Sequence, residues 1–315
     1  MTDRDAGIDL LSVGSWAIFD HFGQLAAYPL EGQTIEVTSA LERLEAPLFG
    51  DCSANVAAVA AALGTRAGLA MGVGDDFVST GYEAHLRALG VDLTAVEVHE
   101  GARSGHNYLF SDPAGEGFCL SHLGVAAMQD GWRVPEATLA RARAVVASER
   151  FGPYTLDALQ RAKARGALTA VNGMVATAGA QAGGFLRVTD LLFIARSELR
   201  DLLRHLGLER PENLFDLGPQ RLFVTHGQDG SETIGVDGRR SIPAVPARRV
   251  VDTTGAGDAY VAGTLSAWLR GLPPIAAAQV GATVASFVVE AWGAQGRLPT
   301  WSDMEARRSA PGTEK

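Results

Sequence analysis

The amino-acid sequence predicts an α/β protein whose mostly parallel sheet is covered by helices. Two observations lead to this fold class. Short apolar runs alternate with helical patterns along most of the chain, as crossover helices between parallel strands require. The 315 residues are 47% hydrophobic, which is sufficient for a large buried core.

The expected elements alternate along the chain. Buried strands are predicted at residues 9–14, 66–74, 144–147, 168–171, 191–195 and 221–225. Helices are predicted at residues 54–63, 77–89, 154–165 and 197–206. Gly64 and Gly90 follow the first two helices, at the position where glycine commonly ends a helix. The dipeptide Asp237-Gly238 predicts a β-hairpin between two short segments.

Two regions interrupt this alternation. Residues 16–49 and 98–122 lack helical periodicity and carry scattered aromatic and polar side chains. They predict extra strands packed outside the main sheet as a lid over a site, and irregular surface loops are the alternative. The chain contains no linker-like or repetitive segment. Residues 7–302 are therefore expected to form one domain, followed by a flexible tail over 303–315.

Composition and charge exclude several classes of protein. The 27 basic and 36 acidic residues give a net charge of −9, which provides no general attraction to nucleic acid or anionic membranes. Only two residues are lysines, and no P-loop lysine is present. Two cysteines cannot form a disulfide framework or a four-cysteine zinc site. No apolar run approaches the ~18 residues of a membrane span, and the charged N-terminus is unlike a signal peptide, so a cytoplasmic protein is expected.

The stretch with the most chemical information is RRVVDTTGAGDAYVAGTLSAWLRGLPP, residues 248–274. Residues 248–251 predict the end of a strand, and a glycine-rich turn over 255–257 leads directly into an amphipathic helix. The free N–H groups and the positive dipole end at a helix start favour an anion. Asp258, in the first turn, could accept a proton from a hydroxyl while the glycine turn stabilises a transferring phosphoryl group. The alternative is an ordinary turn and an acid that the helix dipole favours.

The segment DTTGAGDAYVAG (252–263) resembles the C-terminal signature of the ribokinase-like (PfkB) family of carbohydrate and nucleoside kinases. Four more segments are similar to family motifs: FGDCSANVAAVAAALG (49–64), MGVGDDFVSTGYEAHLRALGVDL (71–93), VTHGQDG (224–230) and GAQGRLPT (293–300), which resembles the closing strand. The likeness covers about residues 10–300. It implies a three-layer α/β/α sandwich with a mostly parallel central sheet and a small β-sheet lid.

The resemblance also implies which residues act on the substrate. Asp258 would be the catalytic base, and Asn55 and Asp20 match positions that hold substrate hydroxyls. The anion hole would be formed by the backbone amides of Gly255, Ala256 and Gly257.

Other positions match the nucleotide and cation sites of the family. Thr225 and Gly227 match the turn that contacts ATP, and Asp252 and Thr254 match positions that help to bind a monovalent cation such as K⁺. Asn172 fits a family position that faces the phosphates, and helix capping is the alternative.

The sequence departs from the family pattern at three places. Asp51 replaces the second glycine of a pair, where it could bind a further hydroxyl or an amine of the substrate or turn outward to solvent. The family motif N-x-x-E, which orders water around Mg²⁺, begins here with Ala195 and retains Glu198; a surface glutamate favoured by the helix dipole is the alternative. Cys52 is expected to be a packing residue, with a reactive thiol as the alternative.

The sequence therefore predicts a kinase that transfers the γ-phosphate of ATP, with Mg²⁺, to a hydroxyl of a sugar or nucleoside, expected to be a primary one. The alternative is a catalytically weak relative that binds a sugar or nucleotide as a regulator. Asp20 and Asp51 disfavour an acceptor that already carries a negative charge. By resemblance, a homodimer through the lid is expected. His106 and Asn107 lie in the second lid segment, where the resemblance implies substrate contacts; both are expected to be surface residues, with substrate contact as the alternative.

Overall fold

The computed structural model describes residues 7–39, 45–114 and 117–309. The strands are β1 (Ile8–Val13), β2 (Phe19–Gln24), β3 (Leu48–Phe49), β4 (Ala67–Gly74), β5 (Asp92–His99), β6 (His106–Ser111), β7 (Gly117–His122), β8 (Ala142–Ser148), β9 (Leu168–Asn172), β10 (Leu191–Ala195), β11 (Arg221–Thr225), β12 (Ser231–Gly235) and β13 (Gly238–Ile242). The helices are α2 (Cys52–Ala62), α3 (Asp76–Ser79), α4 (Tyr82–Ala88), α5 (Glu136–Arg141), α6 (Pro153–Ala164), α7 (Ala182–Arg187), α8 (Arg196–Leu206), α9 (Ala256–Leu269), α10 (Pro274–Val288) and α11 (Trp301–Arg308).

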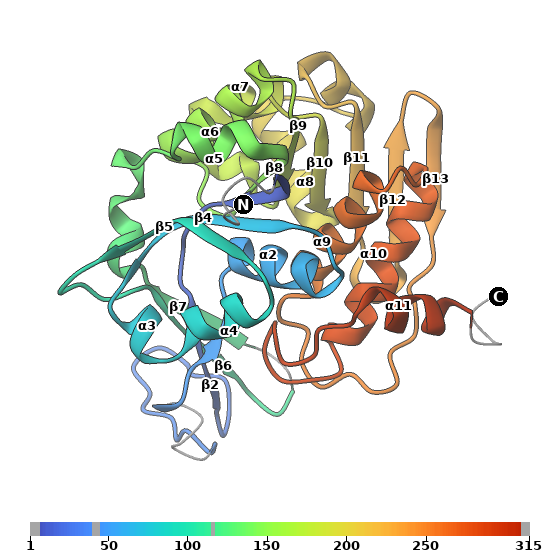
Figure 1. The fold of residues 1–315 in the computed structure, drawn as a ribbon. Coiled ribbons are helices and arrows are strands. Elements are labelled where there is room, and N and C mark those ends of the chain that lie inside the picture. Colours follow the sequence, from blue (N-terminus) through green and yellow to red (C-terminus); the bar gives the residue numbers. More distant parts are fainter. Residues whose placement is uncertain (1–6, 40–44, 115–116, 310–315) are drawn as a thin grey trace.

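The central sheet has the strand order β13-β12-β11-β10-β9-β8-β1-β4-β5 among the described residues (Figure 1). Neighbours from β11 to β5 run parallel, and the predicted hairpin at Asp237-Gly238 adds β12 and β13 in antiparallel orientation. The strands are apolar on both sides, because helices cover both faces of the sheet. In β8, for example, Ala144 and Val146 enter one core while Val145 enters the other.

Helices form the two outer layers of the predicted sandwich. Helices α2, α4, α9 and α10 cover one face of the sheet, and α5, α6, α7 and α8 cover the other (Figure 1). Their apolar side chains pack into the two cores. Helix α9 is buried over most of its length, between α2 and α10. In the described part of the chain, no helix is long and apolar enough to cross a membrane.

The two regions that interrupt the alternation contain a second, smaller sheet. Its strand order is β3-β2-β6-β7, and β2 and β6, which come from different regions, pair in parallel. The prediction of extra strands outside the main sheet is confirmed, although the first residues of the segment 98–122 belong to β5 of the central sheet. Residues 40–44 and 115–116 of these segments lie outside the described residues.

Three predicted elements differ from the observed ones. The helix expected over 77–89 is divided into α3 and α4, because Gly81 between them adopts a left-handed conformation with φ of 85°. Residues 248–251 and 293–300 form no strand: Val251 makes a backbone hydrogen bond only to the end of α10, and the later segment is an irregular loop.

The flexible tail predicted from residue 303 is wrong as far as Arg308. Thr300 Oγ1 accepts a hydrogen bond from Asp303 N at 3.2 Å, and the Asp303 carboxylate accepts one from Thr300 N at 2.9 Å. This reciprocal cap starts α11, and Met304 on its inner face is fully buried. Residues 310–315 lie outside the described residues.

Helices α9 and α10 approach each other closely at Gly281. A Cβ atom on this residue would lie 2.6 Å from the carbonyl oxygen of Tyr260. We expect Gly281→Ala to lower the free energy of unfolding by about 1–3 kcal/mol, because overpacking outweighs the ~1 kcal/mol by which alanine favours a helix. Urea denaturation measures the change. Gly184→Ala in α7 is the control, since its Cβ would meet Leu156 only at 3.6 Å; an equal loss in both variants would contradict the account.

Candidate active site

The predicted site residues gather where several parallel strands end. Asn172 ends β9, Ala195 ends β10 and Thr225 ends β11. Because parallel strands end at the same edge of a sheet, these residues share one border of the molecule, where ligands of open α/β sheets bind. The N-terminal ends of α2 and α9 meet there as well, since Asn55 of α2 contacts Asp258 of α9.

Asp258 lies at the centre of this region and is 6% exposed. Its Oδ2 accepts a hydrogen bond from Asn55 Nδ2 at 2.9 Å, and its Oδ1 accepts one from Asn172 Nδ2 at 3.1 Å. Burial raises the pKa of Asp258 to about 6, and the hydrogen bonds from Asn55 and Asn172 oppose that rise. A carboxyl group with a pKa near neutrality is suited to accept a proton. The capping alternative for Asn172 is wrong, because its amide reaches Asp258.

The glycine turn has a shape that requires glycine at its first position. Gly255 has a φ of 74°, and a Cβ there would lie 2.8 Å from Ala294 Cα. A Cβ on Gly257 would meet no atom within 4 Å. The backbone at the start of α9 is therefore accessible to a ligand on the Gly257 side. Binding of an anion to the amides of this turn stays a prediction.

Asp51 is the N-cap residue of α2. Its Oδ1 accepts hydrogen bonds from Ser53 N at 2.8 Å and Ala54 N at 3.1 Å, and its Oδ2 accepts one from Trp16 N at 2.8 Å. The side chain is 5% exposed, so the solvent-facing alternative is wrong. Burial raises the pKa of Asp51 to about 7 despite these three bonds. N-capping of α2 accounts for Asp51 at this position. A contact between Asp51 and the substrate stays a prediction.

Asp20 comes from β2 of the small sheet and is 4% exposed. Its Oδ1 accepts a hydrogen bond from Asn107 Nδ2 of β6 at 2.9 Å, and Asn107 Oδ1 accepts one from Ser121 Oγ of β7 at 2.6 Å. A Cβ on Gly50 would lie 2.8 Å from Asp20 Cγ, so the remaining glycine of the pair makes room for this carboxylate. Burial, and then the negative charges of nearby aspartates, raise the pKa of Asp20 to about 6.

His106 and Asn107, which were expected to be surface residues, are partly buried and contact other residues of the small sheet. Asn107 holds Asp20, and His106 Nδ1 lies 2.9 Å from His21 Nε2 on the neighbouring strand. The other ring nitrogen of His106 lies 3.3 Å from Asp76 Oδ2. These contacts tie the small sheet to the start of α3. The sequence contained no signal for them beyond the position in the lid segment.

Glu149 is a site residue that the sequence analysis missed. It follows β8 with a φ of 59°, and its Oε1 accepts a hydrogen bond from Cys52 Sγ at 2.9 Å. Burial and the nearby charge of Asp51 raise the pKa of Glu149 well above its usual range. Burial likewise raises the pKa of the Cys52 thiol, which is therefore protonated and a weak nucleophile. The alternative of a reactive Cys52 thiol is not supported.

The turn after β11 carries Thr225 and Gly227 on either side of His226. Arg196 Nε donates a hydrogen bond to His226 Nδ1 at 2.7 Å. His226 therefore carries its proton on Nε2, which lies 3.4 Å from a carboxylate oxygen of Glu232. The hydrogen bond from Arg196 to His226 and an ion pair between Arg196 and Asp229 at 3.7 Å connect the turn to the start of α8.

Glu198, in the first turn of α8, uses one carboxylate oxygen to accept a hydrogen bond from Ala195 N at 2.8 Å.

Asp252 organises its own loop: its Oδ1 accepts bonds from Thr254 N at 3.0 Å and Thr254 Oγ1 at 2.8 Å, and its Oδ2 accepts one from Gly293 N at 2.9 Å. Within residues 7–39, 45–114 and 117–309, no cluster of three or more His, Cys, Asp or Glu side chains could hold a metal ion. The roles of Glu198 and Asp252 in binding a cation stay predictions.

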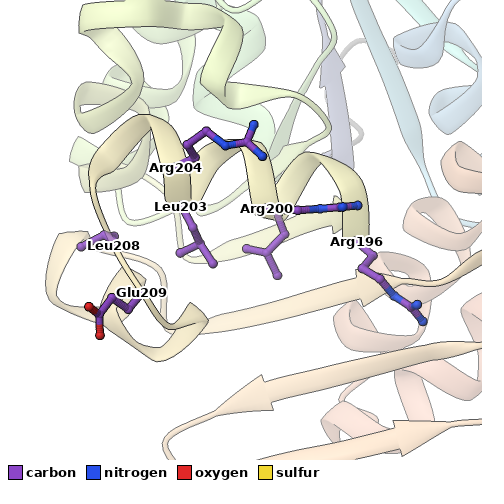
Figure 2. A pocket seen from close by; sticks show the side chains of 7 residues that line it. Arg196, Arg200, Leu203, Arg204, Leu208 and Glu209 are labelled. Atoms are coloured by element: carbon purple, nitrogen blue, oxygen red, sulfur yellow. The ribbon is translucent and has the colours of Figure 1, made fainter.

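A groove of about 330 Å³ runs along α8 (Figure 2). Its lining residues are Arg196, Leu199, Arg200, Leu203, Arg204, Leu208 and Glu209. None of these is a predicted site residue, and the carboxylates around Asp258 are absent from its wall. The groove meets the candidate active site only at Arg196, which contacts His226 in the turn after β11.

Comparison with known proteins decides the family. Residues 49–301 match the family model described as pfkB family carbohydrate kinase. The chain belongs to the pfkB family. This pfkB-family chain is a kinase of the carbohydrate and nucleoside type, and the family uses ATP as its phosphoryl donor.

Two archaeal relatives are similar over almost their full length. A nucleoside kinase of Methanocaldococcus jannaschii is 27% identical over 94% of this chain and 95% of the relative. A nucleoside kinase of Methanothermobacter thermautotrophicus is 29% identical over 96% of both chains. The crystal structure of the M. jannaschii nucleoside kinase, described as a member of the ribokinase family, has a TM-score of 0.85 and covers 95% of this chain and 97% of its own. These likenesses confirm the ribokinase-like fold.

The buried Asp20 carboxyl predicts a pH-dependent cost in stability. Burial raises the pKa of Asp20 to about 6 in the folded protein. The folded state is therefore most stable, as far as Asp20 is concerned, below about pH 4, where the carboxyl is protonated, and this stability is lost as the pH rises through 6. We expect the change in the free energy of unfolding caused by Asp20→Asn to be more favourable at pH 8 than at pH 4, by about 2–3 kcal/mol. Urea denaturation at both pH values measures this difference. Asp201→Asn on the exposed face of α8 is the control, and an equal effect of Asp20→Asn at pH 4 and pH 8 would contradict the prediction.

Proposed function

We propose that this pfkB-family protein is an ATP-dependent nucleoside kinase with Asp258 as its general base. The observation that carries the proposal is the buried Asp258 carboxylate at the start of α9, held by Asn55 and Asn172. A base in this position lies beside the helix start that would bind the transferring phosphoryl group. The acceptor hydroxyl would give its proton to Asp258 as its oxygen attacks the γ-phosphorus and ADP leaves.

The nucleotide would lie along the ends of β9, β10 and β11. In this proposal, the amides of Gly255, Ala256 and Gly257 stabilise charge on the transferring group, and Thr225 and Gly227 contact the nucleotide. Mg²⁺ arrives with ATP and keeps most of its own waters, which Glu198 would help to orient. Asp252 and Thr254 would position backbone oxygens around a monovalent cation.

The acceptor would lie between the small sheet and α2, where Asp20 and Asn55 can hold hydroxyl groups. An uncharged acceptor is favoured, because Asp20 and Asp258, whose pKa values are raised only to about 6, are ionised above that pH and would repel a phosphate. The two relatives that are similar over almost their full length are both nucleoside kinases, and a nucleoside kinase of Burkholderia thailandensis, 20% identical with a TM-score of 0.81, is described in complex with inosine. A nucleoside with a primary hydroxyl meets these requirements.

Substitution of the base tests the proposal. ADP release is measured with Mg-ATP and inosine, cytidine, ribose or ribose 1-phosphate as the acceptor. We expect turnover with a nucleoside and a loss of about 10²–10⁴-fold in Asp258→Asn, because the hydroxyl would lose its proton acceptor. Calorimetry is expected to show retained nucleoside binding, and Asp201→Asn serves as the control.

Two outcomes would contradict this proposal. If Asp258→Asn keeps more than a tenth of wild-type turnover, Asp258 is not the base. If no acceptor yields ADP while a nucleoside still binds, the protein is a regulator, as the replacement of asparagine by Ala195 would allow.

The raised pKa of Asp258 also predicts the pH dependence of turnover. The base works only when ionised, so kcat/KM is expected to fall below about pH 6, tenfold per pH unit at lower values. Asn172→Leu removes a hydrogen bond that favours the ionised Asp258 carboxylate, so we expect this acid limb of the pH profile to move to higher pH. Initial rates from pH 5 to 9 at saturating Mg²⁺ measure both profiles. An acid limb at the same pH in both proteins would refute the assignment.

A further inference from the structure

Gln295 lies in the loop between α10 and α11 and touches two buried residues near the candidate base. Its Nε2 donates hydrogen bonds to Asn55 Oδ1 at 3.0 Å and to Tyr82 Oη at 2.6 Å. Its Oε1 lies 3.0 Å from His85 Nε2. Every polar atom of the Gln295 side chain therefore has a partner, and the partners come from α2 and α4.

Counting donors and acceptors fixes the orientation of both amides. An ionised Asp258 carboxylate only accepts hydrogen bonds, so Asn55 must turn its Nδ2 toward it. Asn55 Oδ1 then faces Gln295 and needs a donor, which the Gln295 amide nitrogen provides. The second hydrogen of that nitrogen goes to Tyr82 Oη, which in turn donates to the carbonyl oxygen of Gly50 at 2.7 Å.

The residues that hold Gln295 are rigidly packed. Tyr82 is fully buried, and its ring stacks on Phe49 with a centroid distance of 4.2 Å. Burial raises the pKa of the Tyr82 hydroxyl well above its usual range, so this group keeps its proton for Gly50. Asn55 is 4% exposed. Gln295 is thus a bridge between a fixed aromatic cluster and the amide that contacts Asp258.

Three consecutive residues of this loop touch three parts of the site. Gly293 N donates to Asp252 Oδ2 at 2.9 Å, Ala294 packs against Gly255 of the glycine turn, and Gln295 binds Asn55. The loop therefore holds Gln295 at a fixed position relative to the start of α9. A displacement of the loop would change the environment of Asp258 through Asn55.

We propose that Gln295 is a positioning residue that holds the Asn55 amide in the orientation in which Nδ2 donates to Asp258. The catalytic part of this inference rests on the proposed function, whereas the positioning itself does not. Without the Gln295 donor, Asn55 Oδ1 loses its hydrogen-bond partner, and the Asn55 amide is no longer anchored at hydrogen-bond distance from Asp258. The ionised form of Asp258 would then lose a hydrogen bond that favours it.

Gln295→Met tests the inference because methionine has a similar length and lacks both donors. The titration of Asp258 is followed by NMR of carboxyl-¹³C-labelled protein without ligands, and its resonance is assigned by its absence in Asp258→Asn. We expect the pKa of Asp258 to be higher in Gln295→Met than in the wild type. An unchanged titration would overturn the inference, and this readout needs no turnover.

Arg297→Met provides a matched control in the same loop, since Arg297 pairs with Glu290 outside the site. It is expected to leave the Asp258 titration unchanged, and an equal shift in both variants would show a general loosening of the loop and overturn the inference. Thermal unfolding checks that each variant is folded. If Gln295→Met does not fold, Gln295→Asn, which withdraws the amide by one carbon–carbon bond, is expected to shift the titration in the same direction.

Kinetic measurements separate this inference from the proposed function. With the acceptor that the wild type phosphorylates, we expect Gln295→Met to lower kcat about tenfold with little change in KM for ATP, and to move the acid limb upward. If the wild type turns over and loses activity in Asp258→Asn while Gln295→Met behaves as the wild type, the positioning role fails and the function stands. If the wild type does not turn over while the NMR titration shifts, the function fails and the positioning stands.

Discussion

Asp258 has almost no access to water, and a carboxylate in such a place ionises near neutral pH only if protein groups replace the lost hydration. Asn55 and Asn172 donate to its two oxygens, and the start of α9 contributes its positive dipole end. Each donor comes from a different element, α2 or β9, so the geometry depends on the packing of the whole sandwich. The close contact of α9 with α10 at Gly281 fixes the helix that carries the carboxylate.

The region around Asp258 concentrates carboxyl groups. Asp20, Asp51 and Glu149 are buried nearby, and burial raises the pKa of each. Backbone amides offset part of this cost at Asp51, and Asn107 does so at Asp20. Such a site is less stable than an apolar core of the same size would be, which is the usual cost of a preorganised active site. It also favours an uncharged acceptor, while Mg²⁺ would offset the charge of ATP.

The sequence predicted most of the central sheet, because most of the parallel strands are continuous apolar runs. The partly exposed β5 was not predicted as a strand. The family resemblance predicted Asn55 and Asp258, whose contact spans 203 positions and has no local signal. Glu149 and Gln295 were missed because their roles depend on which elements the fold brings together. The cap at Thr300 and Asp303 was different: a threonine three residues before an acid is a local signal for a helix start, and the sequence analysis overlooked it and predicted a flexible tail.

The most direct test of the account is a crystal structure with a nucleoside and a non-hydrolysable ATP analogue bound together. The account predicts that the primary hydroxyl oxygen lies within hydrogen-bond distance of the Asp258 carboxylate and in line with the γ-phosphate at the Gly255–Gly257 turn. A complex in which the acceptor hydroxyl contacts neither Asp258 nor the γ-phosphate would contradict the assignment of the base and of the phosphate site.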